Sequence, residues 1–173
     1  MPLKIFYIHG WQSCFDKTKP KVRHLAALGE VAGITVDYVN ESLSEIKSRM
    51  RNRILDFDPD LVIGSSLGGW MAAHIGTEYD MPFVALNPCV NPPQSLGLPE
   101  KEYGPFATGG YGLILLDSGD EMFDSYETER QLRGYYECRR FPGGYHQFAH
   151  MEESIPLIEK FLSMSIVWGV DNV

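Results

Sequence analysis

The sequence predicts an α/β protein with a doubly wound, mostly parallel six-stranded sheet and helices on both faces. Short apolar runs that favour strands alternate with stretches whose apolar residues recur at helical spacing. The run over residues 3–8 is almost continuously apolar, which is typical of a central parallel strand that is buried on both sides. Crossovers between such strands are right-handed, so few topologies remain, and we expect the strand order 2-1-3-4-5-6.

Length, charge and cysteine content restrict the class of protein. The 173 residues, of which 44% are hydrophobic, suit a single domain over residues 1–173. A formal net charge of -8 argues against nucleic acid or an anionic membrane as a partner. No apolar run approaches the roughly 20 residues of a membrane helix. The three cysteines form no paired motif, so we expect a cytoplasmic protein, and its oligomeric state stays open.

The first expected strand is the apolar run of residues 3–8, which His9-Gly10-Trp11 ends. A helix is expected over residues 18–32, with Pro20 in its first turn and a glycine after its last. Residues 34–39 are predicted to form the second strand.

A capping box, Ser42 with Glu45, predicts the start of the next helix. A strand is expected over residues 60–65, followed by a helix that reaches Tyr79, and then by a strand over residues 82–86. The helix after the capping box carries its apolar stripe on Leu43, Ile46, Met50 and Ile54.

Residues 88–111 are rich in proline and glycine and have no sustained periodicity, so we expect a loop or minimal cap over the sheet edge. The strand and helix pattern then resumes to the end of the chain. The expected elements are a strand over residues 111–116, a helix from Asp124 or Ser125 to Leu132, a strand over 135–141 and a helix from Ser154.

The segment Gly64-Ser65-Ser66-Leu67-Gly68 has the Gly-x-Ser-x-Gly pattern of a nucleophile elbow. Its serine must occupy a sharp, strained bend between strand and helix so that the hydroxyl projects above the sheet edge. Side chains in place of the glycines would collide with neighbouring elements. Because a glycine-rich turn is also a common connection, the pattern predicts a nucleophile, Ser66, only together with partners elsewhere in the chain.

A serine nucleophile needs a histidine base and a carboxylate that orients the histidine. His146 lies in a glycine-rich loop before the last helix, where it can reach the sheet edge. Asp120 lies at the tip of a turn after the fifth strand. We predict the triad Ser66, Asp120 and His146, whose chain order is that of the α/β-hydrolases. The alternatives are Asp117 or Asp124 for the acid and His150 for the base.

Two backbone amides are expected to form an oxyanion hole. Leu67 directly follows the nucleophile, and Trp11 lies in the loop after the first strand, where His9 is expected to hold the loop. No metal or cofactor site is expected, because no histidine or carboxylate spacing indicates one. The candidates for an acyl pocket are the aromatic residues Phe15, Tyr103, Phe106, Tyr111 and Tyr145, although aromatic residues near loops are as often plain packing.

Five stretches together resemble the small bacterial YqiA-like esterases of the α/β-hydrolase superfamily. They are Tyr7-Ile-His-Gly-Trp11, Ile63-Gly-Ser-Ser-Leu-Gly-Gly69, Leu86-Asn-Pro88, Ser118-Gly-Asp-Glu121 and Gly143-Gly-Tyr-His146. The resemblance implies carboxylic ester hydrolysis by Ser66, Asp120 and His146. Relative to the wider fold the chain lacks the first two strands, and it departs from the family mainly in residues 88–111.

The sequence therefore predicts a serine esterase that acts on a small-molecule acyl substrate through an acyl-enzyme. A small or short-chain ester is expected, because only residues 88–111 can cover the site. A thioesterase or an acyl-peptide hydrolase would use the same triad. A hydrolase-fold binding module without catalysis is the alternative of another class.

Overall fold

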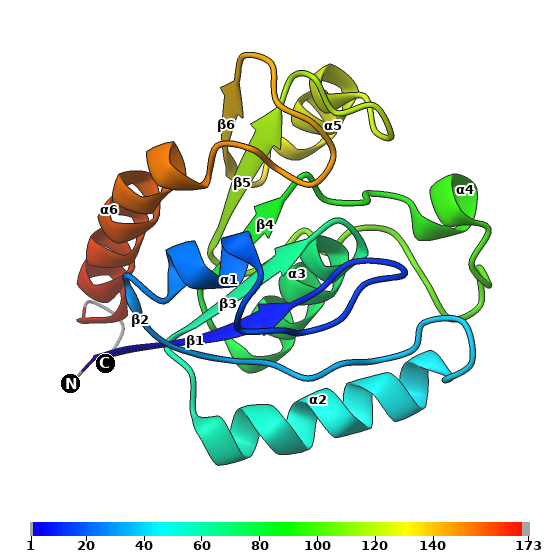
Figure 1. Cartoon of the computed structure of the whole chain (residues 1–173), viewed down its shortest axis with the longest axis horizontal. Coiled ribbons are helices and arrows are strands. Elements are labelled where there is room, and N and C mark those ends of the chain that lie inside the picture. Colours follow the sequence, from blue (N-terminus) through cyan, green and yellow to red (C-terminus); the bar gives the residue numbers. More distant parts are fainter. Residues whose placement is uncertain (1, 171–173) are drawn as a thin grey trace.

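Six parallel strands form one sheet in the predicted order, β2-β1-β3-β4-β5-β6. The computed structural model describes residues 2–170, with side chains as far as residue 164. Figure 1 shows the sheet through the middle of the molecule, with helices on either side of it. The strands are β1 (Leu3–Ile8), β2 (Gly29–Ala32), β3 (Leu61–Ser65), β4 (Phe83–Leu86), β5 (Gly112–Asp117) and β6 (Glu137–Phe141). The helices are α1 (Pro20–Leu25), α2 (Leu43–Phe57), α3 (Leu67–Tyr79), α4 (Pro92–Leu96), α5 (Ser125–Leu132) and α6 (Met151–Val170).

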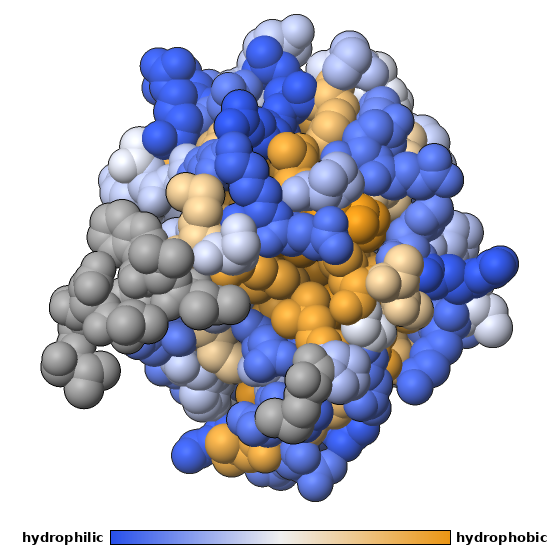
Figure 2. All heavy atoms as spheres, turned by 90° about the vertical axis from the view of Figure 1, so that its left-hand side faces the viewer, coloured by the Kyte–Doolittle hydropathy of each residue, from blue (hydrophilic) through white to orange (hydrophobic). Residues whose placement is uncertain are grey.

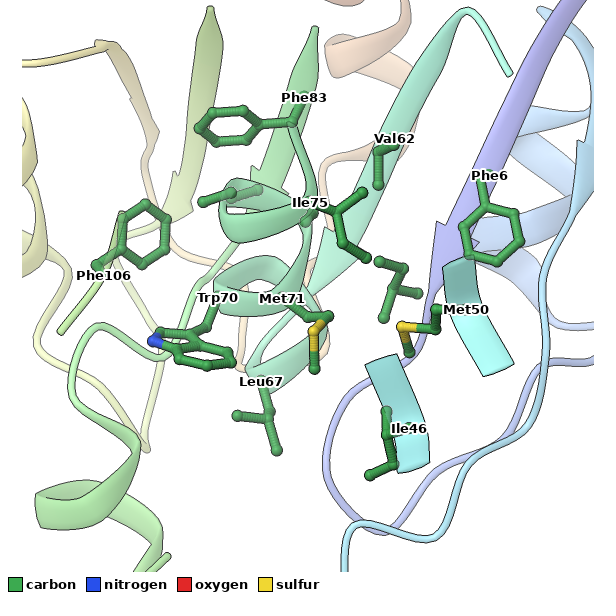
Figure 3. Close-up of a cluster of buried hydrophobic side chains, with 14 of the residues drawn as sticks. Phe6, Ile46, Met50, Val62, Leu67, Trp70, Met71, Ile75, Phe83 and Phe106 are labelled. Atoms are coloured by element: carbon green, nitrogen blue, oxygen red, sulfur yellow. The ribbon is translucent and has the colours of Figure 1, made fainter. Parts of the chain in front are cut away.

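The sheet separates two hydrophobic clusters, because successive residues of a strand point to opposite faces. In β1, Phe6 and Ile8 pack with the cluster that α2, α3 and α5 cover. Ile5 and Tyr7 pack with the cluster that α1 and α6 cover. Figure 3 shows the first cluster, in which Met71 and Ile75 of α3 point toward the side chains of α2.

The second face has less helical cover, since α1 contains only six residues. Figure 2 views the side of the molecule on which α6 and the N-terminal region lie. Apolar side chains gather in the middle of this view, and hydrophilic residues surround them. The two faces of the sheet therefore differ in their helical cover. Helix α3, which directly follows Ser66, belongs to the face that three helices cover.

The predictions for residues 18–39 are wrong in their boundaries. The helix ends at Leu25, and the second strand is Gly29–Ala32 instead of residues 34–39. Gly29 permits this pairing, because a Cβ atom there would lie 2.0 Å from the carbonyl oxygen of Leu3. Val36 and Tyr38 are buried and the residues next to them are exposed, which produces the alternation of a strand. The Val36 amide, however, donates to a histidine ring and not to a neighbouring strand.

Two helix starts show how side chains set element boundaries. Ser42 and Glu45 form the predicted capping box of α2. Helix α6 begins at Met151, three residues before the predicted start at Ser154. The Ser154 hydroxyl donates to the carbonyl oxygen of His150 at 2.6 Å, so it bonds within the first turn and does not cap the helix.

Residues 88–111 contain the short helix α4 and are otherwise irregular, as predicted for a loop.

Candidate active site

Ser66 lies at the predicted bend between β3 and α3. Its backbone has φ 58° and ψ -122°, a conformation that residues other than glycine rarely adopt. The bend depends on close backbone contacts at two glycines. A Cβ atom on Gly64 would lie 1.8 Å from the carbonyl oxygen of Gly68, and one on Gly68 would lie 2.2 Å from that of Ile8. The Gly-x-Ser-x-Gly pattern therefore has a steric cause in this fold.

His146 reaches Ser66 from the loop between β6 and α6. Its Nε2 atom lies 3.0 Å from Ser66 Oγ, and its Nδ1 atom lies 3.0 Å from each carboxylate oxygen of Asp120. An ionised carboxylate only accepts hydrogen bonds, so Nδ1 carries the proton and Nε2 accepts from the serine hydroxyl. Asp120 Oδ1 also accepts the backbone amides of Met122 and Phe123, at 2.8 and 3.0 Å. The structure thus brings the three predicted residues into one hydrogen-bonded chain.

Asp117 and His150, the sequence alternatives for the acid and the base, pair with each other. His150 Nδ1 donates to Asp117 Oδ1 at 2.7 Å. Asp117 is fully buried, and its Oδ2 atom accepts the backbone amides of Tyr145 and Ala149 at 3.3 and 2.7 Å. The Asp117 carboxylate therefore fixes the backbone of the loop both before and after His146.

Asn87 and Glu121 hold the same loop and were not predicted as site residues. The Asn87 side-chain amide donates to the carbonyl oxygens of Tyr145 and His146, at 3.0 and 3.1 Å. The Glu121 carboxylate accepts the backbone amide of His146 at 2.9 Å. A signal for Asn87 exists in the sequence, since it directly follows a strand whose carboxyl end lies beside that of the next strand.

The loop after β1 packs directly against the nucleophile. A Cβ atom on Gly10 would lie 3.0 Å from Ser66 Cβ and 3.6 Å from Ser66 Oγ. His9 holds this loop, as predicted: its Nδ1 donates to the Gly10 carbonyl at 2.8 Å, and its Nε2 accepts the Val36 amide at 3.0 Å. Burial lowers the pKa of His9, so the ring is neutral at pH 7 and can act as this acceptor.

The two amides predicted for the oxyanion hole belong to Leu67, next to Ser66 in the chain, and to Trp11, in the loop after β1. Leu67 is the first residue of α3, where the backbone N–H has no partner within the helix. Trp11 follows Gly10, which contacts Ser66. No hydrogen bond joins either amide to another part of the chain that the structure describes.

The structure does not bring the five aromatic pocket candidates together around Ser66. Tyr103 and Phe106 are buried and pack in the first cluster, and Phe15 packs against the second. Tyr111 precedes β5, at the opposite end of that strand from the site, and stacks on Phe161 at 4.4 Å. Tyr145 is exposed and directly precedes His146.

Lys21 of α1 makes a partly buried contact with the residue that precedes Ser66. Its Nζ donates to Ser65 Oγ at 2.9 Å, and burial lowers its pKa to about 8. The unfolded chain binds this proton up to a pKa of 10.5, so between pH 8 and 10.5 it holds more protons than the folded chain. Stability contributed by Lys21 must therefore rise with pH across this window.

Lys21→Met, which cannot titrate, tests this assignment by urea unfolding at several pH values. The free energy of unfolding of the variant minus that of the wild type is expected to fall by on the order of 3 kcal/mol between pH 8 and 10.5. The subtraction removes the other groups that titrate in this range. A difference that stays constant with pH would show that the lysine titrates normally in the folded protein.

Two further properties of the described residues bear on the kind of site. Among residues 2–170, no group of three or more histidine, cysteine, aspartate or glutamate side chains is arranged to hold a metal ion. No helix in the described part of the chain is long and apolar enough to cross a membrane.

Comparison with known proteins identifies the fold and the family. Residues 4–99, which include Trp11 and Ser66, match the family described as "Uncharacterised protein family (UPF0227)". A UPF0227 protein of Shewanella woodyi is 24% identical over 179 residues, which cover 91% of this chain and 98% of the relative. A UPF0227 protein of Pectobacterium carotovorum is 25% identical over 179 residues, which cover 92% and 99%.

Solved structures share the fold over more than nine-tenths of this chain at low sequence identity. Alpha/beta hydrolase domain-containing protein 10 from mouse is 14% identical, with a TM-score of 0.68 over 93% of this chain and 90% of that one. The monoacylglycerol lipase of Paleococcus ferrophilus is 15% identical, with a TM-score of 0.70 over 92% and 94%. Est1E from Butyrivibrio proteoclasticus is 17% identical, with a TM-score of 0.65 over 95% and 88%. The chain therefore has the α/β-hydrolase fold, as its sequence predicted, and it belongs to the UPF0227 family.

Proposed function

We propose that this protein is a serine hydrolase that cleaves a small or short-chain carboxylic ester through an acyl-enzyme. One observation carries the proposal: Ser66 Oγ, on a strained bend, lies 3.0 Å from a histidine whose other nitrogen lies 3.0 Å from a carboxylate. The Asp120 side chain is 2% exposed and that of His146 is 12% exposed. A nucleophile, a base and an orienting acid in this geometry are what acyl transfer needs.

The first half of the reaction follows from these contacts. His146 Nε2 takes the proton of Ser66 as Oγ attacks the ester carbonyl carbon. Asp120 keeps the proton on Nδ1 and stabilises the imidazolium that forms. The amides of Leu67 and Trp11 donate to the oxyanion of the tetrahedral intermediate.

The second half restores the enzyme. The His146 imidazolium protonates the departing alcohol, and the acyl group stays on Ser66. Water then attacks the acyl carbon while His146 again accepts a proton, and the acid leaves when the proton returns to Ser66 Oγ. The scheme uses only groups of the chain and water.

Labelling with a fluorophosphonate probe, together with a panel of p-nitrophenyl esters, tests this function. Covalent labelling of Ser66 and ester turnover would support it. Labelling with turnover of acyl-coenzyme A or acyl-peptides, and none of esters, would assign the triad to a thioesterase or an acyl-peptide hydrolase. If the protein is not labelled and turns over none of these substrates, it is a binding module and not an enzyme of this kind.

Short acyl chains are expected to react faster than long ones. The only helix in the segment over residues 88–111 is the five-residue α4. Two of the aromatic residues in this segment, Tyr103 and Phe106, pack into the core. It therefore offers little apolar surface to a long acyl chain. We expect kcat/KM to be higher for p-nitrophenyl acetate and butyrate than for the palmitate in detergent-matched assays. A higher value for the palmitate would refute the expectation and leave the serine mechanism standing.

A further inference from the structure

The chain that leaves β4, residues 86–89, binds the backbone of Ser66 from both sides. The Ser66 amide donates to the Leu86 carbonyl at 3.0 Å, and the Ser66 carbonyl accepts the Cys89 amide at 3.0 Å. Pro88, between these two contacts, packs against α3 so closely that a Cβ atom on the facing glycine would lie 3.0 Å from its own Cβ. The 86–89 segment therefore supports the strained bend on which the proposed nucleophile lies.

The side chain of Asn87, in the middle of this segment, reaches the loop that carries the proposed base. Its Nδ2 atom donates to the carbonyl oxygens of Tyr145 and His146, at 3.0 and 3.1 Å. Its Oδ1 atom accepts the backbone amide of Asp117, at the end of β5, at 2.7 Å. Figure 1 shows the loop between β6 and α6, in orange, close to the ends of β4 and β5. Asn87 is 1% exposed, so water does not compete for these bonds.

The conformation of Asn87 and its contacts together require an asparagine. Its φ is 43°, in the left-handed region that glycine, asparagine and aspartate adopt most readily. Glycine has no side chain, and an ionised aspartate only accepts hydrogen bonds. Of these three residue types, asparagine alone supplies two donors for the loop carbonyls and one acceptor for the amide at the end of β5.

Backbone strain gathers at the carboxyl edge of the sheet. The residues with positive φ in segments that follow β1, β3, β4 and β6 are Gln12, Ser66, Asn87 and Phe148. The other described non-glycine residues with positive φ are the C-caps of α2 and α3, where a left-handed residue is common. Strain of this kind persists only where surrounding contacts hold it, and it clusters at functional sites. The strained turn at Asn87 therefore calls for an explanation beyond chain reversal.

The loop that carries His146 depends on such outside contacts for its position. Gly143 and Gly144 directly precede Tyr145, and both have positive φ. A glycine-rich stretch has wide conformational freedom by itself. The His146 carbonyl is fixed by Asn87, whose neighbours in the chain bind Ser66. One short segment therefore supports both atoms of the 3.0 Å contact between Ser66 Oγ and His146 Nε2.

We propose that Asn87 is a positioning residue of the proposed hydrolase, and that it sets the distance between the nucleophile and the base. Asn87 acts through the backbone of His146 and does not contact the substrate. The proposal rests on the proposed function of the Ser66 site and adds to it a residue outside the triad. Misplacing a reacting group by about 1 Å costs on the order of 100-fold in rate, so the role has a measurable effect.

Two substitutions of Asn87 test the proposal. Asn87→Asp keeps the size and the acceptor and removes both donors, whereas Asn87→Gly fits the backbone and removes the whole side chain. Both are expected to lower the acylation rate constant for p-nitrophenyl acetate by roughly 10- to 100-fold. The half-saturating concentration should change little, because the base acts in the chemical step. Stopped-flow release of p-nitrophenolate measures both quantities, and the fraction folded, from circular dichroism, corrects for lost stability.

Asn91→Asp is the matched control, because it makes the same chemical change four residues further along the chain. Asn91 is exposed and caps α4 by accepting the Gln94 amide at 3.3 Å, which an aspartate can also do. Its acylation rate and Tm are expected to equal those of the wild type. Unchanged rates in both Asn87 variants would overturn the proposal. A loss in Asn87→Asp alone would also overturn it, since the added charge and not the missing donors would be the cause.

A double variant separates positioning from stability. In a His146→Ala background, Asn87→Asp should cause no further loss of rate, because no base is left to be positioned. It should still lower the Tm there, since two buried carbonyls lose their donors in either background. A loss of rate by the same factor with and without His146 would show that Asn87 does not act through the histidine.

The His146 ring itself gives a readout that needs no substrate. NMR of the protein with ¹⁵N-labelled histidine, assigned with His146→Ala, follows the Nδ1 proton that bonds to Asp120. Both Asn87 variants are expected to shift this resonance upfield and to speed its exchange with water. If the wild type hydrolyses no ester but these changes are found, the proposed function fails and the positioning of His146 stands. If the wild type hydrolyses p-nitrophenyl acetate and the resonance and rate are unchanged in both variants, the role of Asn87 fails alone.

Discussion

Ser66→Ala is expected to abolish covalent labelling by a fluorophosphonate and to lower kcat for a short ester by about 10⁵- to 10⁶-fold, since removing a serine nucleophile costs roughly this much in a comparable hydrolase. The reason is chemical: in the proposed mechanism Oγ is the atom that attacks, and His146 hydrogen-bonds to no other hydroxyl among the described residues. Labelling followed by mass spectrometry identifies the modified residue, and single-turnover kinetics measures the loss of rate.

The adjacent serine provides the control. Ser65 occupies the same turn, but its Oγ accepts from Lys21 and does not contact His146. Ser65→Ala is therefore expected to label at Ser66 and to retain most of the ester turnover. Labelling of Ser66→Ala at another residue, with turnover preserved, would place the nucleophile elsewhere.

Asp120→Asn is expected to lower kcat by about 10⁴-fold, the cost measured for the acid of a comparable triad. The amide oxygen of the substituted side chain could still accept from Met122 and Phe123, so the turn is expected to keep its shape. The amide nitrogen, however, would face His146 Nδ1 and favour the tautomer that cannot accept the serine proton. Thermal unfolding should show only a small change in Tm, which separates a chemical effect from a structural one.

A double variant tests whether Asp120 acts through the histidine. His146→Ala alone should be nearly as inactive as His146→Ala with Asp120→Asn, because the acid has no role without the base. Additive losses in log kcat would mean that Asp120 acts on the reaction by another route.

Asp117→Asn is the informative comparison, because Asp117 is the neighbouring carboxylate. An amide nitrogen at this position would oppose the donors Tyr145, Ala149 or His150, and an unsatisfied buried group costs about 1–3 kcal/mol. The variant is expected to lower the Tm and to disturb the loop that carries His146. If Asp117→Asn kept its Tm and lost activity while Asp120→Asn stayed active, the acid would be Asp117.

The sequence could predict the order of the sheet even though it misplaced one strand. The order depends on alternation and crossover handedness, which hold whichever stretch near residue 30 pairs with β1. Residues 34–39 alternate between buried and exposed because Val36 and Tyr38 pack under α2, without any ladder. Periodicity reports burial, and it cannot report whether a backbone partner lies alongside.

The sequence by itself determined the elbow, the residue types of the proposed site and their order along the chain. These are local: Gly64 and Gly68 leave room for Ser66 within a few residues, and a strand before a helix sets the bend. Only the tertiary structure decided which carboxylate meets which histidine, pairing Asp120 with His146 and Asp117 with His150. The two acids are only three residues apart in one turn. A stretch this short does not indicate which of the two side chains points into the buried layer and which points toward Ser66. The side-chain direction of Asp117 is set by backbone amides in the loop that carries His146. Each buried amide needs an acceptor, and Asp117 is the carboxylate that the fold encloses beside them.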